Sequence, residues 1–168
     1  YKYSNNSWKS FNGGAYDSLF DITSVNINPK NTDEVFFGSW GKGLIKTTDG
    51  EVNKVFDKYN SGIQSLNLFT YHKIGGSVFD SNGVLWVSCS GSPGANVNYP
   101  LVAFDGETWY TYDMNNMLIN NTHAGEILLD INGYKWFPSK DNGVFVFDEN
   151  GTLSNQEDDR IALITSGE

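Results

Sequence analysis

The chain has 168 residues, of which 39% are hydrophobic and 15% are aromatic, so it is long enough to form a buried core. Its formal net charge of −9 disfavours a nucleic-acid partner, because a phosphate backbone would repel it. The single cysteine, Cys89, permits no internal disulfide and no cysteine-based zinc site. No apolar run approaches the ~20 residues that a membrane helix needs, so we expect no membrane-spanning segment.

Aromatic and turn-forming residues dominate the composition and favour strands over helices. The 5 Trp, 9 Tyr and 11 Phe suit pleated, half-buried surfaces. The 18 Gly, together with many Asn and Asp, supply the turns that short strands require. We therefore predict an all-β protein.

In chain order, the strand signals form three groups of four. The first group is SVNIN, EVFFGS, GLIKT and NKVFD; the second is GSVFD, VLWVSC, LVAF and TWYTYD; the third is GEILLD, YKWFPS, GVFVFD and a weaker TLSN. The groups recur at a constant spacing, since Trp86 − Phe36 is 50 and Trp136 − Trp86 is also 50. This periodicity indicates an internal repeat of one four-stranded unit.

The second strand of each repeat carries two adjacent large apolar residues, at Phe36–Phe37, Trp86–Val87 and Trp136–Phe137. Neighbouring strand residues point to opposite faces of a sheet, so both faces must be covered. Four strands per repeat and two buried faces predict β-propeller blades, which stack face to face.

The repeats predict three full blades, with split fragments at both ends. The blades are expected at 21–57, 76–113 and 125–154, residues 1–12 as the end of a preceding blade, and 160–168 as the start of the next. A closed propeller needs at least about four blades. We therefore expect residues 1–168 to be a single segment of a larger propeller, whose remaining blades pack against it.

The stretches DSNGVLWV (80–87) and DINGYKWF (130–137) are interpreted as hairpin turns. Asn-Gly between two strands is a strong turn signal, and the preceding Asp accepts backbone N–H groups. A calcium loop is the alternative, but it needs an acidic residue at its twelfth position. That position is Gly91 in the first stretch and Asp141 in the second. The turn is favoured, and we expect no metal and no cofactor.

The tight turns all fall on one side of the predicted disc, and the longer links fall on the other. Rigid scaffolds place functional side chains on such loops. We predict that Trp40, Lys42, Tyr99 and Lys140 bind a ligand on the loop side, where aromatic rings could stack on sugars. Packing of the loop tyrosines onto the blades is the alternative for Tyr99.

Catalytic signatures are missing, so we predict no catalytic residues and no enzyme. GSWGKG lacks the P-loop spacing, and only His72 and His123 are available for a triad or a metal site. Asp57 and Asp113 close equivalent strands and could form a carboxylate pair for glycoside chemistry. Their recurrence in successive repeats favours strand-end caps instead.

Two levels of resemblance follow from these residues. VFDSNGVLWVS and LLDINGYKWFP resemble the repeats of two-component-regulator propellers from Bacteroidetes. Longer segments follow one another in a fixed order: ITSVNINPKNTDEVFFGSWGKGLI, then IGGSVFDSNGVLWVS, then DINGYKWFP with DNGVFVFDENGT, EDDR and LIT. In this order they resemble the PorZ family of cell-surface accessory proteins of the type IX secretion system. This second match extends over nearly the whole chain.

The PorZ resemblance implies two propellers of about seven blades followed by a small β-domain. It also implies export to the cell surface or outer membrane, with a signal peptide outside this chain. The implied partners are a PorU-like sortase and anionic lipopolysaccharide, in a non-catalytic docking role. Two alternatives remain: the extracytoplasmic sensor propeller of a hybrid two-component system that binds a saccharide, and a carbohydrate-active enzyme.

Overall fold

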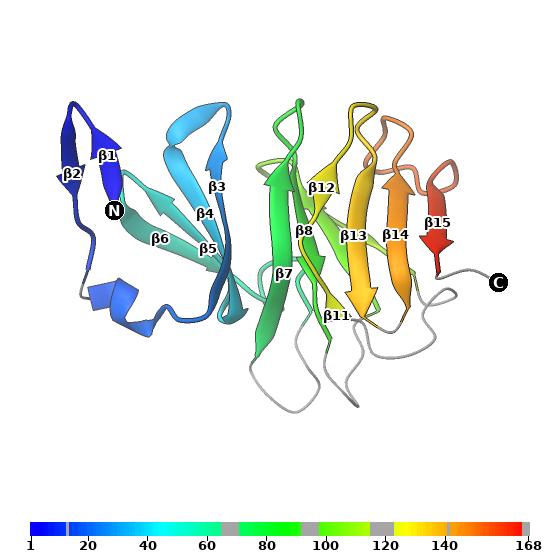
Figure 1. Cartoon of the computed structure of the whole chain (residues 1–168), viewed down its shortest axis with the longest axis horizontal. Coiled ribbons are helices and arrows are strands. Elements are labelled where there is room, and N and C mark those ends of the chain that lie inside the picture. Colours follow the sequence, from blue (N-terminus) through cyan, green and yellow to red (C-terminus); the bar gives the residue numbers. More distant parts are fainter. Residues whose placement is uncertain (13, 65–70, 92–97, 115–122, 141, 166–168) are drawn as a thin grey trace.

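The structure is a computed structural model that describes residues 1–12, 14–64, 71–91, 98–114, 123–140 and 142–165. These residues form strands and one short 3-10 helix, η1 (Gly14–Ser18), which confirms the all-β prediction. The strands are arranged side by side as antiparallel sheets with their turns at two opposite edges (Figure 1). We call the three four-stranded units of this part of the chain the first, second and third blades.

The bounds of the strands follow the predicted repeats. The first blade contains β3 (Ile22–Asn28), β4 (Asn31–Gly41), β5 (Gly43–Thr48) and β6 (Glu51–Phe56). The second contains β7 (His72–Phe79), β8 (Leu85–Cys89), β9 (Leu101–Phe104) and β10 (Trp109–Tyr112). The third contains β11 (His123–Ala124) and β12 (Leu128–Leu129) as an interrupted inner strand, then β13 (Lys135–Lys140), β14 (Gly143–Asp148) and β15 (Arg160–Ile164).

One predicted boundary is wrong. We expected residues 160–168 to begin another blade, with the weaker TLSN segment as the fourth strand of the third blade. Instead β15 pairs antiparallel with β14, from Asp148↔Arg160 to Val144↔Ile164, and is therefore that fourth strand. The physical reason is the number of apolar side chains that reach the core: Ile161 and Leu163 both pack against it from β15, whereas residues 152–155 contribute Leu153 alone.

Two hydrophobic clusters fill the seams between blades. The first joins residues of the first and second blades, among them Phe36, Phe56 and Val87. The second joins the second and third blades around Trp86 and Phe137. Trp86 and Val87 are both 0% exposed, so the middle blade is covered on both faces, as the paired apolar residues predict.

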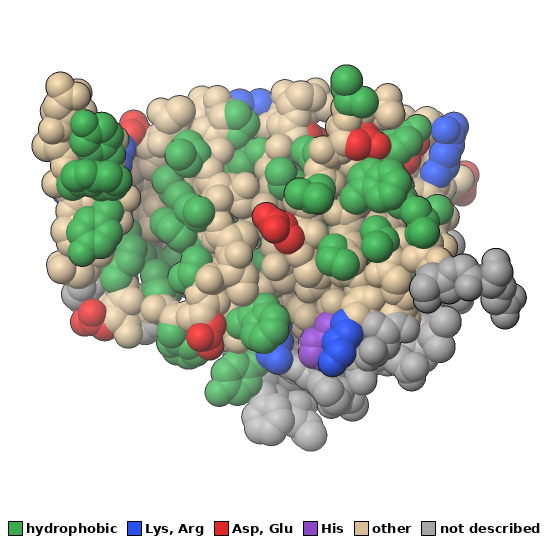
Figure 2. Space-filling view, viewed as in Figure 1, with side chains coloured by type: hydrophobic (Ala, Val, Ile, Leu, Met, Phe, Trp, Pro, Cys, Tyr) green, Lys and Arg blue, Asp and Glu red, His purple; other side chains and the backbone are tan. Residues whose placement is uncertain are grey.

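The outward faces of the first and third blades remain open. On the first blade, Val25 and Ile27 are largely exposed. On the third blade, a cross-strand row runs from Leu128 through Trp136 to Val146. Figure 2 shows hydrophobic side chains spread over the regions that carry β3, β12 and β13. The apolar pattern therefore continues to the two ends of the array, where no described blade covers it.

The N-terminal residues form a separate hairpin of β1 (Lys2–Ser4) and β2 (Ser7–Lys9). Its Tyr1 and Tyr3 face the open side of the first blade across a hollow of about 610 Å³ that Val25 and Phe37 also line. That this hairpin is the end of a preceding blade stays a prediction.

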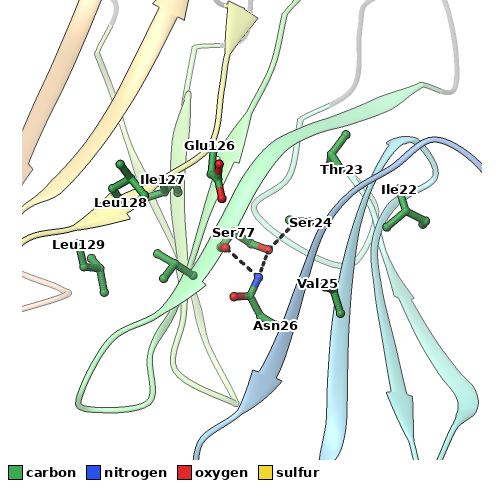
Figure 3. A pocket seen from close by; sticks show the side chains of 11 residues that line it. Ile22, Thr23, Ser24, Val25, Asn26, Ser77, Glu126, Ile127, Leu128 and Leu129 are labelled. Carbon is green, nitrogen blue, oxygen red and sulfur yellow. Dashed lines mark hydrogen bonds between the residues drawn. The ribbon is translucent and has the colours of Figure 1, made fainter. Parts of the chain in front are cut away.

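Side chains of β3 link the first blade to the inner edge of the second (Figure 3). The inner edge of β7 leaves backbone carbonyls without strand partners, and buried carbonyls need a donor. Thr23 donates to the carbonyl of Ile74 at 2.9 Å, and Asn26 donates to the carbonyl of Ser77 at 2.7 Å. These bonds hold β3 against β7. Both are the innermost strands of their blades, and the innermost strands of a propeller surround its axis.

Candidate functional site

The loop-side rim of the blades carries the predicted ligand-binding residues. It lies at the lower edge in Figure 1, opposite the tight turns between β7 and β8 and between β12 and β13. Figure 2 shows lysine and histidine side chains gathered at this edge below β7 and β13. Of the longer links predicted here, residues 65–70, 92–97, 115–122 and 141 lie outside the described residues. The described part of this rim therefore carries lysines together with aspartates such as Asp21, whose backbone oxygen accepts from Trp40 N at 2.9 Å.

Trp40 and Lys42 come together where the first blade meets the second. Trp40, 43% exposed, pairs with Lys73 across β4 and β7, and the Lys73 Nζ lies 5.1 Å from the centroid of its ring. Lys42 forms a β-bridge with His72, and its Nζ lies 5.9 Å from the ring centroid of Phe20. The result is an exposed indole beside the ammonium of Lys73, with Lys42 two residues further along the chain, between β4 and β5.

Lys73 was missed by the sequence reasoning. It follows His72 at the start of the innermost strand of the second blade, on the same side as Trp40. The alternation of turns and links already placed residue 73 on the loop side. The missing information was the cross-blade pairing of Trp40 with Lys73, which joins residues 33 positions apart and has no local sequence signal.

Tyr99 and Lys140 lie elsewhere on the protein. Tyr99 packs against the hydrophobic cluster of the first seam, and its backbone N donates to Gln64 Oε1 at 3.1 Å. This arrangement is the loop packing that was the alternative for Tyr99. Lys140 is exposed at the rim end of β13, where it pairs with His123 of β11. The structure thus brings Trp40 and Lys42 together and places Lys140 on the third blade.

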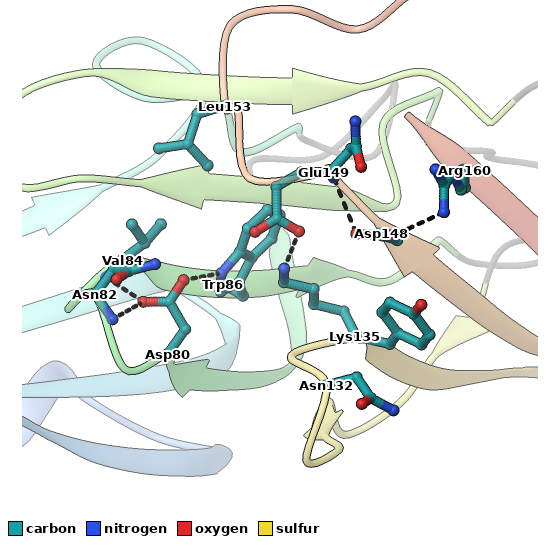
Figure 4. Close-up of polar contacts among 12 residues, drawn as sticks. Asp80, Asn82, Val84, Trp86, Asn132, Lys135, Asp148, Glu149, Leu153 and Arg160 are labelled. Atoms are coloured by element: carbon teal, nitrogen blue, oxygen red, sulfur yellow. Dashed lines mark hydrogen bonds and ion pairs between the residues drawn. The ribbon is translucent and has the colours of Figure 1, made fainter. Parts of the chain in front are cut away.

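The D-x-N-G stretches are turns of nearly identical geometry. Asp80 Oδ1 accepts from the backbone N of Asn82 and Val84, both at 2.9 Å (Figure 4). Asp130 Oδ1 accepts from the equivalent atoms at 2.8 and 3.0 Å. Each carboxylate already holds its own turn, which supports the turn interpretation. The Asp141 of the calcium alternative lies outside the described residues.

Each turn also anchors an indole. Trp86 Nε1 donates to Asp80 Oδ2 at 3.0 Å, and Trp136 Nε1 donates to Asp130 Oδ2 at 3.0 Å. The second carboxylate oxygen therefore satisfies the only polar atom of a large aromatic side chain six residues further on. The fixed spacing of Asp and Trp in both repeats was a visible signal of this bond.

A charged cluster occupies the seam between the second and third blades (Figure 4). The Lys135 side chain is 2% exposed, forms an ion pair with Glu149, and places its Nζ 4.1 Å from the ring centroid of Trp86. Asp159 Oδ1 is buried and has no hydrogen-bond partner among the described residues. Burial, and then the charges of Asp158, Glu149 and Asp148, raise the pKa of Asp159 to about 6, against the opposing effect of Lys135.

This raised pKa predicts that stability increases as the pH falls. The folded-state pKa of Asp159, about 6, exceeds its ordinary value of 3.8, so the folded chain binds the proton more tightly. The gain is fully present below about pH 4 and is lost as the pH rises through 6. Because the site is partly solvated, we expect Asp159→Asn to stabilise the chain at pH 8 by about 1 kcal/mol.

Urea denaturation of Asp159→Asn at pH 8 and at pH 4 checks this expectation. The advantage of the variant should disappear at pH 4, where the wild-type carboxyl is already protonated. Asp17→Asn, an exposed position on η1, is the control for the change in net charge. A constant difference at both pH values, or the same effect in the control, would contradict the assignment.

The residues considered for catalysis have other roles in the structure. Asp57 Oδ1 accepts from the backbone N of Tyr59 at 2.8 Å, which is a strand-end cap. Asp113 follows β10, the equivalent strand of the second blade. Burial raises the pKa of Cys89 to about 12, so its thiol is not a nucleophile at neutral pH.

The described residues contain neither a cluster of metal ligands nor a long apolar helix. Among them, no group of three His, Cys, Asp or Glu side chains is placed to hold a metal ion. No helix in the same part of the chain is long and apolar enough to cross a membrane.

The fold is similar to part of PorZ from Porphyromonas gingivalis, an essential bacterial surface component of the type IX secretion system. The two structures superpose with a TM-score of 0.69 and 24% sequence identity, and the match covers 86% of this chain. The same match covers 19% of the PorZ chain, so this chain spans about a fifth of its length. No family of protein sequences and no curated protein matches the chain. The comparison establishes a PorZ-like propeller fold.

Proposed function

We propose that the chain is a non-catalytic propeller segment of a PorZ-like component of the type IX secretion system at the bacterial cell surface. The fold match to PorZ supports this role. We further propose that the loop-side rim docks an anionic glycan, such as anionic lipopolysaccharide. Docking of a protein, for example a PorU-like sortase, at the same rim is the second form of the proposal.

The observation that carries the glycan proposal is the group of Trp40, Lys42 and Lys73. An exposed indole offers an apolar edge and face to a sugar ring, and ammonium groups pair with carboxylate or phosphate. The whole chain carries a net charge of −9, so these two lysines are not needed for solubility. Local cations beside an aromatic ring favour an anionic saccharide over a neutral one.

We expect Lys73→Met to weaken binding of anionic lipopolysaccharide about tenfold, because it removes one charge-assisted contact. Trp40→Ala should weaken it by a similar factor. The control is Lys54→Met, which breaks another lysine–aromatic pair, with Phe56 at 4.7 Å, on the outer strand β6. Binding is measured by calorimetry with the intact polysaccharide and with the same polysaccharide after removal of its anionic groups.

The two polysaccharides separate the proposals. Binding of the anionic form alone, lost in Lys73→Met and kept in Lys54→Met, would support glycan docking. Equal binding of both forms would instead favour the sensor-propeller alternative. An anionic glycan that binds wild type and both rim variants equally would contradict the site at Trp40 and Lys73.

A further inference from the structure

The innermost strands line a second hollow that is distinct from the rim (Figure 3). It has a volume of about 560 Å³ and is lined by β3, by Ser77 and Val78 of β7, and by residues 126–129 before and within β12. None of the rim residues Trp40, Lys42 or Lys73 lines it. Because the innermost strands of a propeller surround its axis, this hollow faces the central channel.

The orientation of Asn26 is fixed by its partners. Its Nδ2 lies 2.7 Å from the backbone oxygen of Ser77 and 2.8 Å from Ser77 Oγ. A carbonyl oxygen can only accept, so the amide nitrogen must face Ser77 and both of its protons are engaged. The Asn26 Oδ1 is therefore turned away from Ser77 and offers acceptor capacity to the hollow.

Glu126 supplies the charge. It is the one charged residue among the described residues that line the hollow, and it is exposed. Its backbone is held closely against β7, since a Cβ added at Gly76 would lie 2.5 Å from the Glu126 Cα. In Figure 3 the Glu126 side chain extends toward Ser77 and Asn26. The Glu126 carboxylate and the oriented amide oxygen of Asn26 thus line one hollow.

The walls around these two acceptors are apolar. Val78 of β7, and Ile127 and Leu129 beside and within β12, contribute them from the second and third blades. Among the described residues, no Lys, Arg or His side chain lines the hollow to neutralise Glu126. Acceptors without a matching cation, inside an acidic chain, favour a ligand that brings its own positive charge and N–H donors.

We propose that this axial hollow binds a protonated primary amine attached to a short apolar or hydroxylated body. The ammonium donates to the Glu126 carboxylate and to Asn26 Oδ1, and the body packs against Val78 and Leu129. A lysine side chain of a peptide and an amino sugar both carry this group. The site goes beyond the proposed function, because the rim favours anions whereas the hollow favours a cation.

The test uses the 168-residue chain and two pairs of probes that differ in charge. The first pair is Nα-acetyl-lysine methylamide and its norleucine counterpart, and the second is glucosamine and N-acetylglucosamine. Binding is followed by ¹H–¹⁵N NMR at the backbone amides of Ser24, Ser77 and Glu126 and at the side-chain amide of Asn26. We expect shifts with the charged member of at least one pair, and the pair that responds identifies the source of the amine.

Glu126→Gln should weaken binding of the responding amine at least about tenfold, because it removes a charge-assisted hydrogen bond. Glu107→Gln is the matched control: it removes the same charge from an exposed turn between β9 and β10. The same weakening in both variants would reduce the effect to general electrostatics and overturn the site. Shifts that are absent, or equal for charged and neutral probes, would also overturn it. Loss of glycan binding at the rim does not affect this result.

Discussion

Trp86→Ala is expected to lower the free energy of unfolding by about 3–5 kcal/mol, because it empties the centre of a seam. Trp86 is 0% exposed and stacks on Tyr112, with ring centroids 5.5 Å apart. Phe147 of the third blade covers it at 5.8 Å, and Lys135 lies over its ring. The substitution also removes the donor to Asp80.

Trp136→Ala provides the matched comparison within the same chain. Trp136 occupies the equivalent position fifty residues later and makes the same bond, at 3.0 Å, to Asp130. It lies on the open face of the third blade and is only partly buried, so we expect a loss of about 1–2 kcal/mol. Urea denaturation of both variants measures the difference. Equal losses would mean that the seam beside Trp86 contributes no more than the open face does.

The contrast between these two tryptophans shows what the sequence reveals. Their spacing, the paired apolar residues and the D-x-N-G turns predict the repeat, the strands and the stacking of blades, because these depend on local periodicity. The sequence does not reveal which copy of the motif is covered. That depends on the neighbouring blade. Phe147 and Lys135 of the third blade cover Trp86, whereas no described blade lies against the face that carries Trp136.

The candidate site was predictable to a smaller extent. The alternation of turns and links assigns Trp40 and Lys42 to the loop side, and their binding of a ligand stays a prediction. Lys73 was not predicted, since its pairing with Trp40 joins two blades and leaves no short-range signal. Tyr99 was predicted as a ligand contact from its residue type. Its packing against the first seam depends on residues distant in the sequence, so the sequence did not reveal it.

The position of β15 was missed for a related reason. A fixed count of four strands per fifty residues favoured the nearer segment at 152–155. The chain instead continues through an acidic stretch before Ile161 and Leu163 return to the core. Burial of two apolar side chains outweighed the shorter connection, since a longer loop adds only about 0.6 kcal/mol for each doubling of its length.

Lys135 is the residue whose environment differs most from the repeat pattern. The equivalent position in the second blade, 135 − 50, is Leu85, which is 0% exposed. The third blade thus places an ammonium where its neighbour has a leucine, and Glu149 neutralises it. Removing one partner of a buried pair leaves an uncompensated charge, whereas removing both is often neutral.

Lys135→Met is therefore expected to cost about 2–3 kcal/mol, because Glu149 then faces an apolar seam without its partner. The double variant Lys135→Met, Glu149→Gln should lie within about 1 kcal/mol of wild type at pH 5, where Asp159 is largely protonated, since both charges of the pair are removed and methionine fills a volume that Leu85 shows to be tolerated. Urea denaturation of the two single variants and the double variant completes the cycle. Additive losses would show that the two side chains act independently.

The same variants connect this ion pair to the pH dependence of the seam. Lys135 lowers the pKa of Asp159, so its removal should raise that pKa above 6 and move the loss of stability to higher pH. Glu149 acts in the opposite direction, because its charge raises the pKa of Asp159. The double variant should therefore return the pH midpoint toward that of wild type. A midpoint that does not move in Lys135→Met would show that Asp159 is not coupled to the cluster, and would limit the role of Lys135 to its contacts with Glu149 and Trp86.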